Sequence, residues 1–103
     1  MAYRLIFSPS VFEDIQDAVS WYNSKQKGLG KRFFTAVKTH YKLLKNDPYC
    51  ISVKYDNIRC LPISKFPYTI HYQIIANSEE VVVFAIYHDS RNPSIWKERI
   101  TPE

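Results

Sequence analysis

The sequence predicts a single α+β domain: an N-terminal strand, then an antiparallel pair of helices packed on a mainly antiparallel sheet of about four strands. Three observations lead to this prediction. The chain has 103 residues, which is the size of one domain. Apolar residues recur at helical spacing in its first half and at strand spacing in its second half. No internal repeat or linker divides it, so we expect one domain over residues 1–103.

The N-terminal segment is predicted to form a short strand followed by a helix. Tyr3 to Phe7 alternate in the manner of a strand, and Ser8-Pro9-Ser10 ends it. A proline suits the first turn of a helix, and Ser10 with Glu13 fits a capping box. The expected buried stripe of this helix consists of Phe12, Ile15, Val19 and Tyr22, with Ala18 beside it, and it fades at Asn23-Ser24-Lys25.

A second helix is predicted after Gly28-Leu29-Gly30. Its apolar residues are again three or four apart, and it ends at Asn46-Asp47-Pro48. The link between the two helices is short, which predicts an antiparallel hairpin. Seven basic residues and no acidic residue lie from Lys25 to Lys45. We interpret this run as a solvated helix face in preference to a nucleic-acid groove. The expected buried stripe of the second helix is Leu29, Phe33, Val37, Tyr41 and Leu44.

After Pro48 the apolar period changes from helical to two, which indicates strands. The final pair forms a hairpin around Asn77-Ser78, and its apolar run Val81 to Tyr87 predicts a central strand. Pro62 cannot donate a ladder hydrogen bond, so it indicates a sheet edge or a bulge. A short tail element over 94–100 is expected to pack on the body through Trp96. The expected strands cover residues 51–55, 58–63, 66–75 and 79–88.

Composition and motifs exclude several classes of function. A net charge of +4 and a pI near 9.1 permit a nucleic acid or an acidic protein as partner. The sequence contains no apolar run near the length of a bilayer and no secretion segment, so we expect a cytoplasmic protein without membrane association. The two cysteines match no zinc or redox motif, the three histidines fall on separate elements, and the glycines lack a nucleotide fingerprint. We therefore expect no metal and no cofactor.

Four polar residues near strand ends form the candidate site. Arg59 begins one strand, Lys65 precedes the next, and His88 and Arg91 follow the most apolar strand. We expect Arg59, His88 and Arg91 to gather along one rim of the sheet. This set suits RNA cleavage, because an imidazole can transfer a proton and arginines can neutralise charge on a phosphate. Lys65 and Arg91 are also candidates for binding a target or a nucleic acid.

A purely structural interpretation of these residues stays open. His88 could bond to the backbone at the strand end, while Arg59 and Arg91 pair with Asp89 or Glu98. Catalysis by acid and base also needs a second proton-transfer group, and the sequence offers no good candidate for it. Asp56 is the only carboxylate between Pro48 and Ser78, and Tyr68 or Tyr87 would need a strongly lowered pKa.

Several segments together resemble the RelE/ParE superfamily of toxins from bacterial type II toxin–antitoxin systems, of the plasmid stabilisation type. The likeness covers nearly the whole chain. It rests on Tyr3-Arg4-Leu5-Ile6-Phe7-Ser8, Trp21-Tyr22, Gly28-Leu29-Gly30-Lys31-Arg32-Phe33, Ile58-Arg59, Lys65-Phe66-Pro67-Tyr68-Thr69-Ile70-His71-Tyr72 and the closing Ile86-Tyr87-His88-Asp89-Ser90-Arg91-Asn92-Pro93 with Trp96.

The resemblance implies a small toxin that a cognate antitoxin neutralises in a hetero-oligomer. RelE-like members cut mRNA on the ribosome with clustered lysines and arginines and a late tyrosine, whereas ParE-like members poison DNA gyrase without an established hydrolytic site. This sequence is closer to the ParE-like branch, because it lacks that lysine cluster and that tyrosine. A gyrase inhibitor is therefore the first hypothesis. A ribosome-dependent mRNA endonuclease using Arg59, His88 and Arg91, or a member that has lost toxicity, is the alternative.

Overall fold

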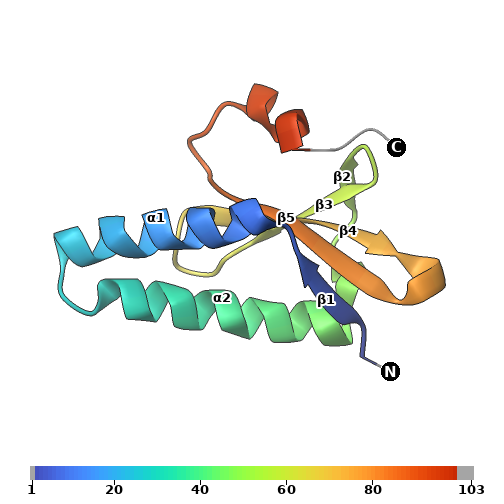
Figure 1. Cartoon of the computed structure of the whole chain (residues 1–103), viewed down its shortest axis with the longest axis horizontal. Coiled ribbons are helices and arrows are strands. Elements are labelled where there is room, and N and C mark those ends of the chain that lie inside the picture. The colour runs from blue at the N-terminus through green and yellow to red at the C-terminus, as the bar shows by residue number, and fades with distance from the viewer. Residues whose placement is uncertain (1, 100–103) are drawn as a thin grey trace.

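The computed structural model describes residues 2–99, with the side chains of residues 2–96, as two helices packed on one face of a five-stranded sheet (Figure 1). The predicted α+β class and helical hairpin are confirmed. The strand order is β1-β5-β4-β3-β2. In chain order the elements are β1 (Arg4–Phe7), α1 (Pro9–Lys25), α2 (Leu29–Asn46), β2 (Val53–Tyr55), β3 (Ile58–Pro62), β4 (Tyr68–Ile75) and β5 (Glu80–His88), with short 3-10 helices η1 (Pro48–Cys50), η2 (Ala76–Ser78) and η3 (Pro93–Arg99).

The sheet is antiparallel except at one edge. The strands β2 to β5 form successive antiparallel hairpins, and β1 pairs with β5 in parallel, from Arg4 opposite Glu80 to Phe7 opposite Val83. The apolar strand β5 therefore lies between β1 and β4, as its sequence predicts. Pro62 is the last residue of β3, and β2 pairs only with the start of that strand. The missing amide hydrogen of Pro62 therefore leaves no gap in the β2–β3 hydrogen bonds.

The start of α1 closes the part of the β5 edge that β1 does not reach. Ser8 is the N-cap, with no side-chain capping bond, so the predicted capping box of Ser10 and Glu13 is wrong. The Ser10 hydroxyl instead donates to the carbonyl of Phe84 at 3.5 Å, and the Asp14 carboxylate accepts from the Ile86 amide at 3.0 Å. These side chains satisfy backbone groups of β5 that would otherwise lack a partner strand.

The two helices are held close by the glycine link. Gly28 adopts a left-handed conformation with φ +85° and is the N-cap of α2. The Gly30 amide donates to Asn23 Oδ1 at 2.9 Å, and a Cβ on Gly30 would lie 2.6 Å from the carbonyl oxygen of Val19. Only glycine fits at this contact. The two glycines of Gly28-Leu29-Gly30 are therefore explained by the link between the helices, with no need for a nucleotide-binding loop.

The core lies between the helices and the sheet and is rich in aromatic rings. Phe33 is fully buried and has its ring centroid 5.4 Å from Tyr22, 5.3 Å from Phe66 and 5.0 Å from Tyr68. The expected stripe of α2 is confirmed at its centre, where Phe33, Val37 and Leu44 are buried. The expected burial of Phe12 is wrong, since its ring is 62% exposed, and the ring of Phe34 on α2 is 39% exposed.

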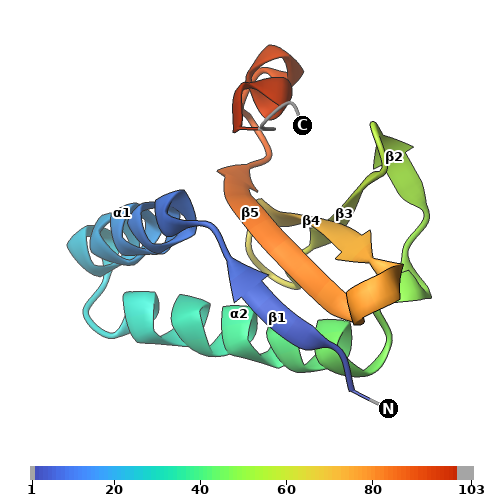
Figure 2. The same cartoon turned by 45° about the vertical axis from the view of Figure 1, so that its right-hand side comes forward.

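The opposite face of the sheet carries a smaller cluster that η3 covers (Figure 2). A shift of register between β4 and β5 lets Phe84 and Ala85 both join this cluster, as a β-bulge allows. Trp96 stacks on Tyr55 with ring centroids 5.0 Å apart, which confirms that the tail packs on the body. In the part of the chain that the structure describes, neither helix is both long and apolar enough to cross a membrane.

Candidate functional site

His88 and Arg91 lie together where β5 ends. The ring of His88 contacts Tyr68, its partner on β4, at a centroid distance of 5.0 Å. The Ser90 amide donates to His88 Nδ1 at 3.0 Å, and the Ser90 hydroxyl lies 2.8 Å from the same nitrogen. Because a backbone N–H can only donate, Nδ1 accepts, and the neutral ring carries its proton on Nε2. This contact is the strand-end backbone bond that the structural interpretation expected of His88.

Arg91 connects two hollows on either side of this strand end. Its amide donates to the carbonyl of His88 at 3.0 Å, and its guanidinium lies 6.0 Å from the ring centre of Tyr87. A hollow of about 340 Å³ opens towards α1, and one of about 230 Å³ opens towards Trp96. His88 and Arg91 line both hollows. The hollow towards α1 is also lined by Asp14, Asp17 and Trp21 of that helix. The hollow towards Trp96 is also lined by Lys54, His71 and Asp89.

Arg59 lies elsewhere, so the expected single rim with His88 and Arg91 is not formed. The Arg59 guanidinium donates to the carbonyl of Ile51 and lies 5.0 Å from the ring centre of Tyr49. Arg59 lines neither hollow at the end of β5. It pairs with Tyr72 whereas His88 pairs with Tyr68, so the two are roughly 13 Å apart along the sheet and two strands across.

The direction of the strands explains this separation. Both β3 and β5 are antiparallel to β4, so they run in the same direction. Arg59 is near the start of β3 and His88 is at the end of β5, which places the two at opposite ends of the sheet. Neither Arg59 nor Arg91 forms an ion pair with any side chain of residues 2–96, and Asp89 instead accepts from the Thr69 hydroxyl at 2.7 Å. Glu98, the other expected partner, lies outside the described side chains.

Lys65 lies in the loop between β3 and β4, away from the hollows that His88 lines. It has a left-handed backbone with φ +72° and is exposed. It lines a different hollow, against α2, together with Lys31, Arg32 and His40. The structure therefore distributes the four sequence-predicted residues over three places.

A cluster around His71 was not identified from the sequence. It lies on the face of the sheet that η3 covers, called the second face below. His71 is 1% exposed, and its Nδ1 lies 2.9 Å from the Tyr55 hydroxyl and 3.6 Å from Cys60 Sγ. Burial raises the pKa of the Cys60 thiol to about 11, so this thiol stays protonated at neutral pH and is a weak nucleophile. The alternation of β4 was the available signal, because it places Thr69 and His71 on the face opposite to Ile70.

Metal binding receives no support from this cluster. Within residues 2–96, no group of three or more His, Cys, Asp or Glu side chains is arranged to hold a metal ion.

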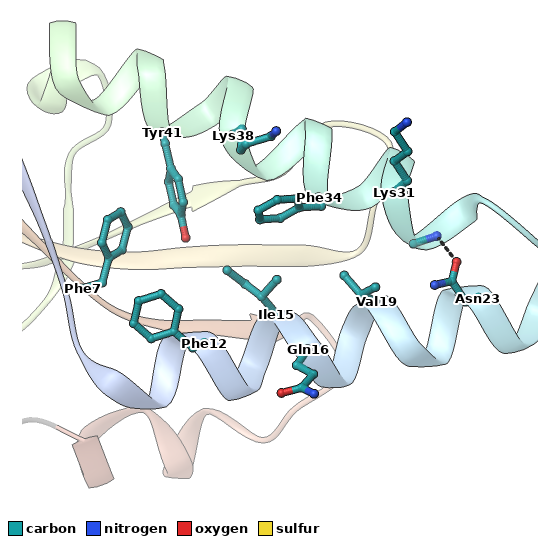
Figure 3. Close-up of a pocket in the computed structure, with 11 residues that line it drawn as sticks. Phe7, Phe12, Ile15, Gln16, Val19, Asn23, Lys31, Phe34, Lys38 and Tyr41 are labelled. Carbon is teal, nitrogen blue, oxygen red and sulfur yellow. Dashed lines mark hydrogen bonds between the residues drawn. The ribbon is translucent and has the colours of Figure 1, made fainter.

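An apolar groove of about 710 Å³ lies between the helices and β1 (Figure 3). Phe12 and Phe34 point into it from opposite helices, which accounts for their exposure. The hydroxyl of Tyr41 also points into the groove, where it is buried without a hydrogen bond to any described residue. Burial, with a smaller effect from the charge of Asp14, raises the pKa of Tyr41 well above its ordinary value.

The comparisons with known proteins agree with this architecture. The sequence profile of the ParE toxin of type II toxin–antitoxin systems, parDE, matches residues 5–93. The chain belongs to the ParE toxin family. No curated protein matches the sequence significantly.

Solved structures of toxin–antitoxin systems share the fold of this ParE-family chain. A chain of the chromosomal ParDE system of P. aeruginosa is 12% identical, with a TM-score of 0.62, covering 84% of this chain and 96% of that one. A chain of the intact E. coli RelBE toxin–antitoxin complex is 16% identical, with a TM-score of 0.68, covering 87% and 100%. The isolated E. coli RelE toxin is 15% identical, with a TM-score of 0.65, covering 94% and 95%. At these identities the likeness concerns the fold.

Proposed function

We propose that an antitoxin segment fills the groove between the helices of this ParE-family toxin, and that the released toxin acts by binding DNA gyrase. Support for an antitoxin comes from the family and from relatives whose structures are toxin–antitoxin complexes. The observation that carries the choice of target is the separation of Arg59 from His88 and Arg91. A ribonuclease that used all three would need them at one phosphate, so their separation favours binding over cleavage.

The groove has the features that an amphipathic helix requires of its binding site. Its floor and walls are apolar, and exposed aromatic rings of this size are unusual on a protein that has no partner. Lys31 and Lys38 stand at its border, and the Lys38 ammonium lies 4.9 Å from the ring centre of Phe34. An acidic segment with an apolar face therefore matches both the groove and its border.

Substitution of Phe34 tests the antitoxin site. Phe34→Asp places a charge in the groove at little cost to folding, and we expect it to weaken binding of the antitoxin encoded beside the toxin by about tenfold or more. Leu43→Asp is the matched control, because Leu43 lies on the same helix, is 40% exposed and does not line the groove. Equal loss in both variants, measured by calorimetric titration, would place the antitoxin elsewhere.

Two parallel assays test the target. Purified toxin is incubated with gyrase and relaxed plasmid, and separately with translating ribosomes and mRNA. We expect inhibited supercoiling with intact message, and weaker inhibition by Arg91→Ala, which changes the surface at the end of β5. Lys27→Ala, which removes the same charge from an exposed position in the helix link, should inhibit like the wild type.

Two outcomes contradict the proposed target. Message cleavage that is lost in both Arg59→Ala and His88→Ala would establish an endoribonuclease. Failure of the folded toxin to affect either assay, together with harmless overexpression, would establish a member without toxicity.

A further inference from the structure

A cluster of cations on α2 adjoins the apolar groove, with Lys31 at the border of both. Lys31 and Arg32, with Thr35 and Thr39 at helical spacing, form one side of a hollow of about 510 Å³. The loop between β3 and β4 forms the other side with Ser64 and Lys65. Basic side chains more than 30 positions apart in the sequence are thus brought to the same surface.

A histidine bridge holds the loop against the helix. His40 Nδ1 lies 2.7 Å from the carbonyl oxygen of Ala36, and the Ser64 amide donates to His40 Nε2 at 3.2 Å. Because the carbonyl can only accept, Nδ1 carries the proton and Nε2 is the acceptor. The next residue, Lys65, has a left-handed backbone at φ +72°. The position of Lys65 beside α2 is therefore fixed by hydrogen bonds on both sides of His40.

No acidic side chain balances this charge. The residues that line the hollow include no Asp or Glu, and within residues 2–96 none of Lys31, Arg32 and Lys65 forms an ion pair. All three are exposed. Other basic residues of the hairpin lie over aromatic rings, as Lys25 does over Trp21 at 5.0 Å. Like charges held close together repel one another, so an anion bound between them is stabilised.

We propose that this hollow, formed by α2 and the β3–β4 loop, binds the phosphodiester backbone of a nucleic-acid duplex. Lysine, arginine and hydroxyl groups are the usual partners of backbone phosphates, and Thr35 and Ser64 supply hydroxyls here. The inference does not rest on the proposed target or on the antitoxin site. Lys31 borders both the apolar groove and this hollow, so the test below leaves it unchanged.

The aromatic content of the hollow favours a duplex over a single strand. Binding of single strands uses exposed rings on which bases stack. Two rings line this hollow. Both nitrogens of His40 are engaged in hydrogen bonds with the backbone, and Phe66 packs perpendicular to Tyr22 and Phe33, with centroids 5.2 and 5.3 Å away. Both rings are only partly exposed, and Phe66 packs against the main core. A duplex presents its phosphates outwards and needs no such ring, so contact with the backbone is the mode that fits, without base recognition.

Fluorescence anisotropy with labelled duplexes of DNA and of RNA tests the proposal. The probes have the same sequence, and salt is varied from about 50 to about 200 mM. The test variant is Arg32→Gln with Lys65→Asn, because asparagine tolerates the left-handed backbone of residue 65. We expect about tenfold weaker binding and a salt dependence of log K that is smaller by roughly two, since each phosphate contact contributes about 0.9.

A matched double variant distinguishes the effect of this hollow on affinity from the effect of net charge. Lys42→Gln with Lys45→Gln removes the same amount of positive charge, here entirely from α2, and neither residue lines the hollow. We expect it to change the affinity by less than about twofold. Circular dichroism confirms that both variants are folded. Preference for one duplex over the other identifies the natural backbone as DNA or RNA.

Three results would overturn the proposal. The first is that the wild-type protein binds neither duplex at low salt. The second is equal loss of affinity in the two double variants, which would assign binding to net charge. The third is that a single-stranded oligonucleotide or polyglutamate competes better than an unlabelled duplex, which would assign the hollow to a different kind of ligand.

Discussion

The two faces of the sheet differ in how they are covered. On one face, α1 and α2 bury a core of aromatic and aliphatic side chains, in which Phe33 and Tyr72 are fully shielded from water. On the other face, η3 covers a small cluster, and a buried histidine, His71, lies among Tyr55, Cys60 and Trp96. Apolar burial is the main source of stability, so we expect the helix-covered face to carry most of it. The second face combines a buried polar side chain with one open hollow at the end of β5.

The largest expected effect tests this difference directly. Phe33→Ala should lower the free energy of unfolding by about 3–5 kcal/mol, because it removes a fully buried ring from among three others. Trp96→Ala, on the second face, should cost only about 1–2 kcal/mol, because Trp96 is partly exposed. Urea denaturation of both variants measures the two values. Equal costs would contradict the unequal division of stability between the faces.

Gly30→Ala tests the helix layer itself. The added Cβ would meet the Val19 carbonyl oxygen at 2.6 Å, which is backbone and cannot rotate away, so the helices must separate. We expect a loss of about 1–3 kcal/mol in urea denaturation. Gly28→Asn is the control, since no atom lies within 4 Å of its Cβ position and asparagine tolerates φ +85°. If Gly30→Ala were no less stable than this control, the close contact would be of no energetic importance.

Tyr41→Phe tests the helix-covered face at the groove, where α1 and α2 do not fully cover each other. The buried Tyr41 hydroxyl has no hydrogen bond within the described structure, and an unsatisfied buried hydroxyl lowers stability. Removing it should leave the free toxin unchanged or up to about 1 kcal/mol more stable, as measured by thermal denaturation. A clear loss of stability would mean that the hydroxyl has a partner in the folded protein.

The smallest expected effect comes from the exposed ion pair of Arg4 with Glu80, where β1 forms the edge of the sheet. The hydrogen bond from Arg4, with a second from Ser78, lowers the pKa of the Glu80 carboxyl below its ordinary value. A lowered pKa in the folded state stabilises the protein above the unfolded pKa, and this contribution is lost as the pH falls through the folded value. Wild type should therefore be slightly more stable than Glu80→Gln near pH 7, and the difference should disappear by about pH 3. A difference that grew in acid would contradict the assigned pKa direction.

Local patterns predicted the elements well, because helical and strand periodicity depend on neighbouring residues only. The hairpin of β4 and β5, the break between the helices at Gly28 and the packing of Trp96 were all predictable in this way. The exposed rings of Phe12 and Phe34 were not, since helical spacing identifies an apolar face without saying what covers it. Here the two apolar faces are only partly covered by each other, and a groove remains.

The candidate site was predicted less well, for a geometric reason. His88 and Arg91 are close because they are three positions apart, at the two ends of one turn. Arg59 was grouped with them because it also lies near a strand end, but β3 and β5 run in the same direction and their opposite ends are far apart. Strand directions follow from consecutive hairpins, so this separation was accessible from the sequence. The cation cluster of Arg32 and Lys65 was not, because it needs the loop to fold back on α2.

The sequence by itself determined the two helices, the strands that follow them and most of the aromatic core, because hydrophobic periodicity, glycine and proline act over a few residues. Only the tertiary structure decided that β1 joins β5 in parallel, that α1 satisfies the free edge of β5, and that the helices leave an open groove. These features depend on the direction and separation of segments distant in the chain. Periodicity carries no information about that, whereas backbone hydrogen bonding and packing between layers determine it.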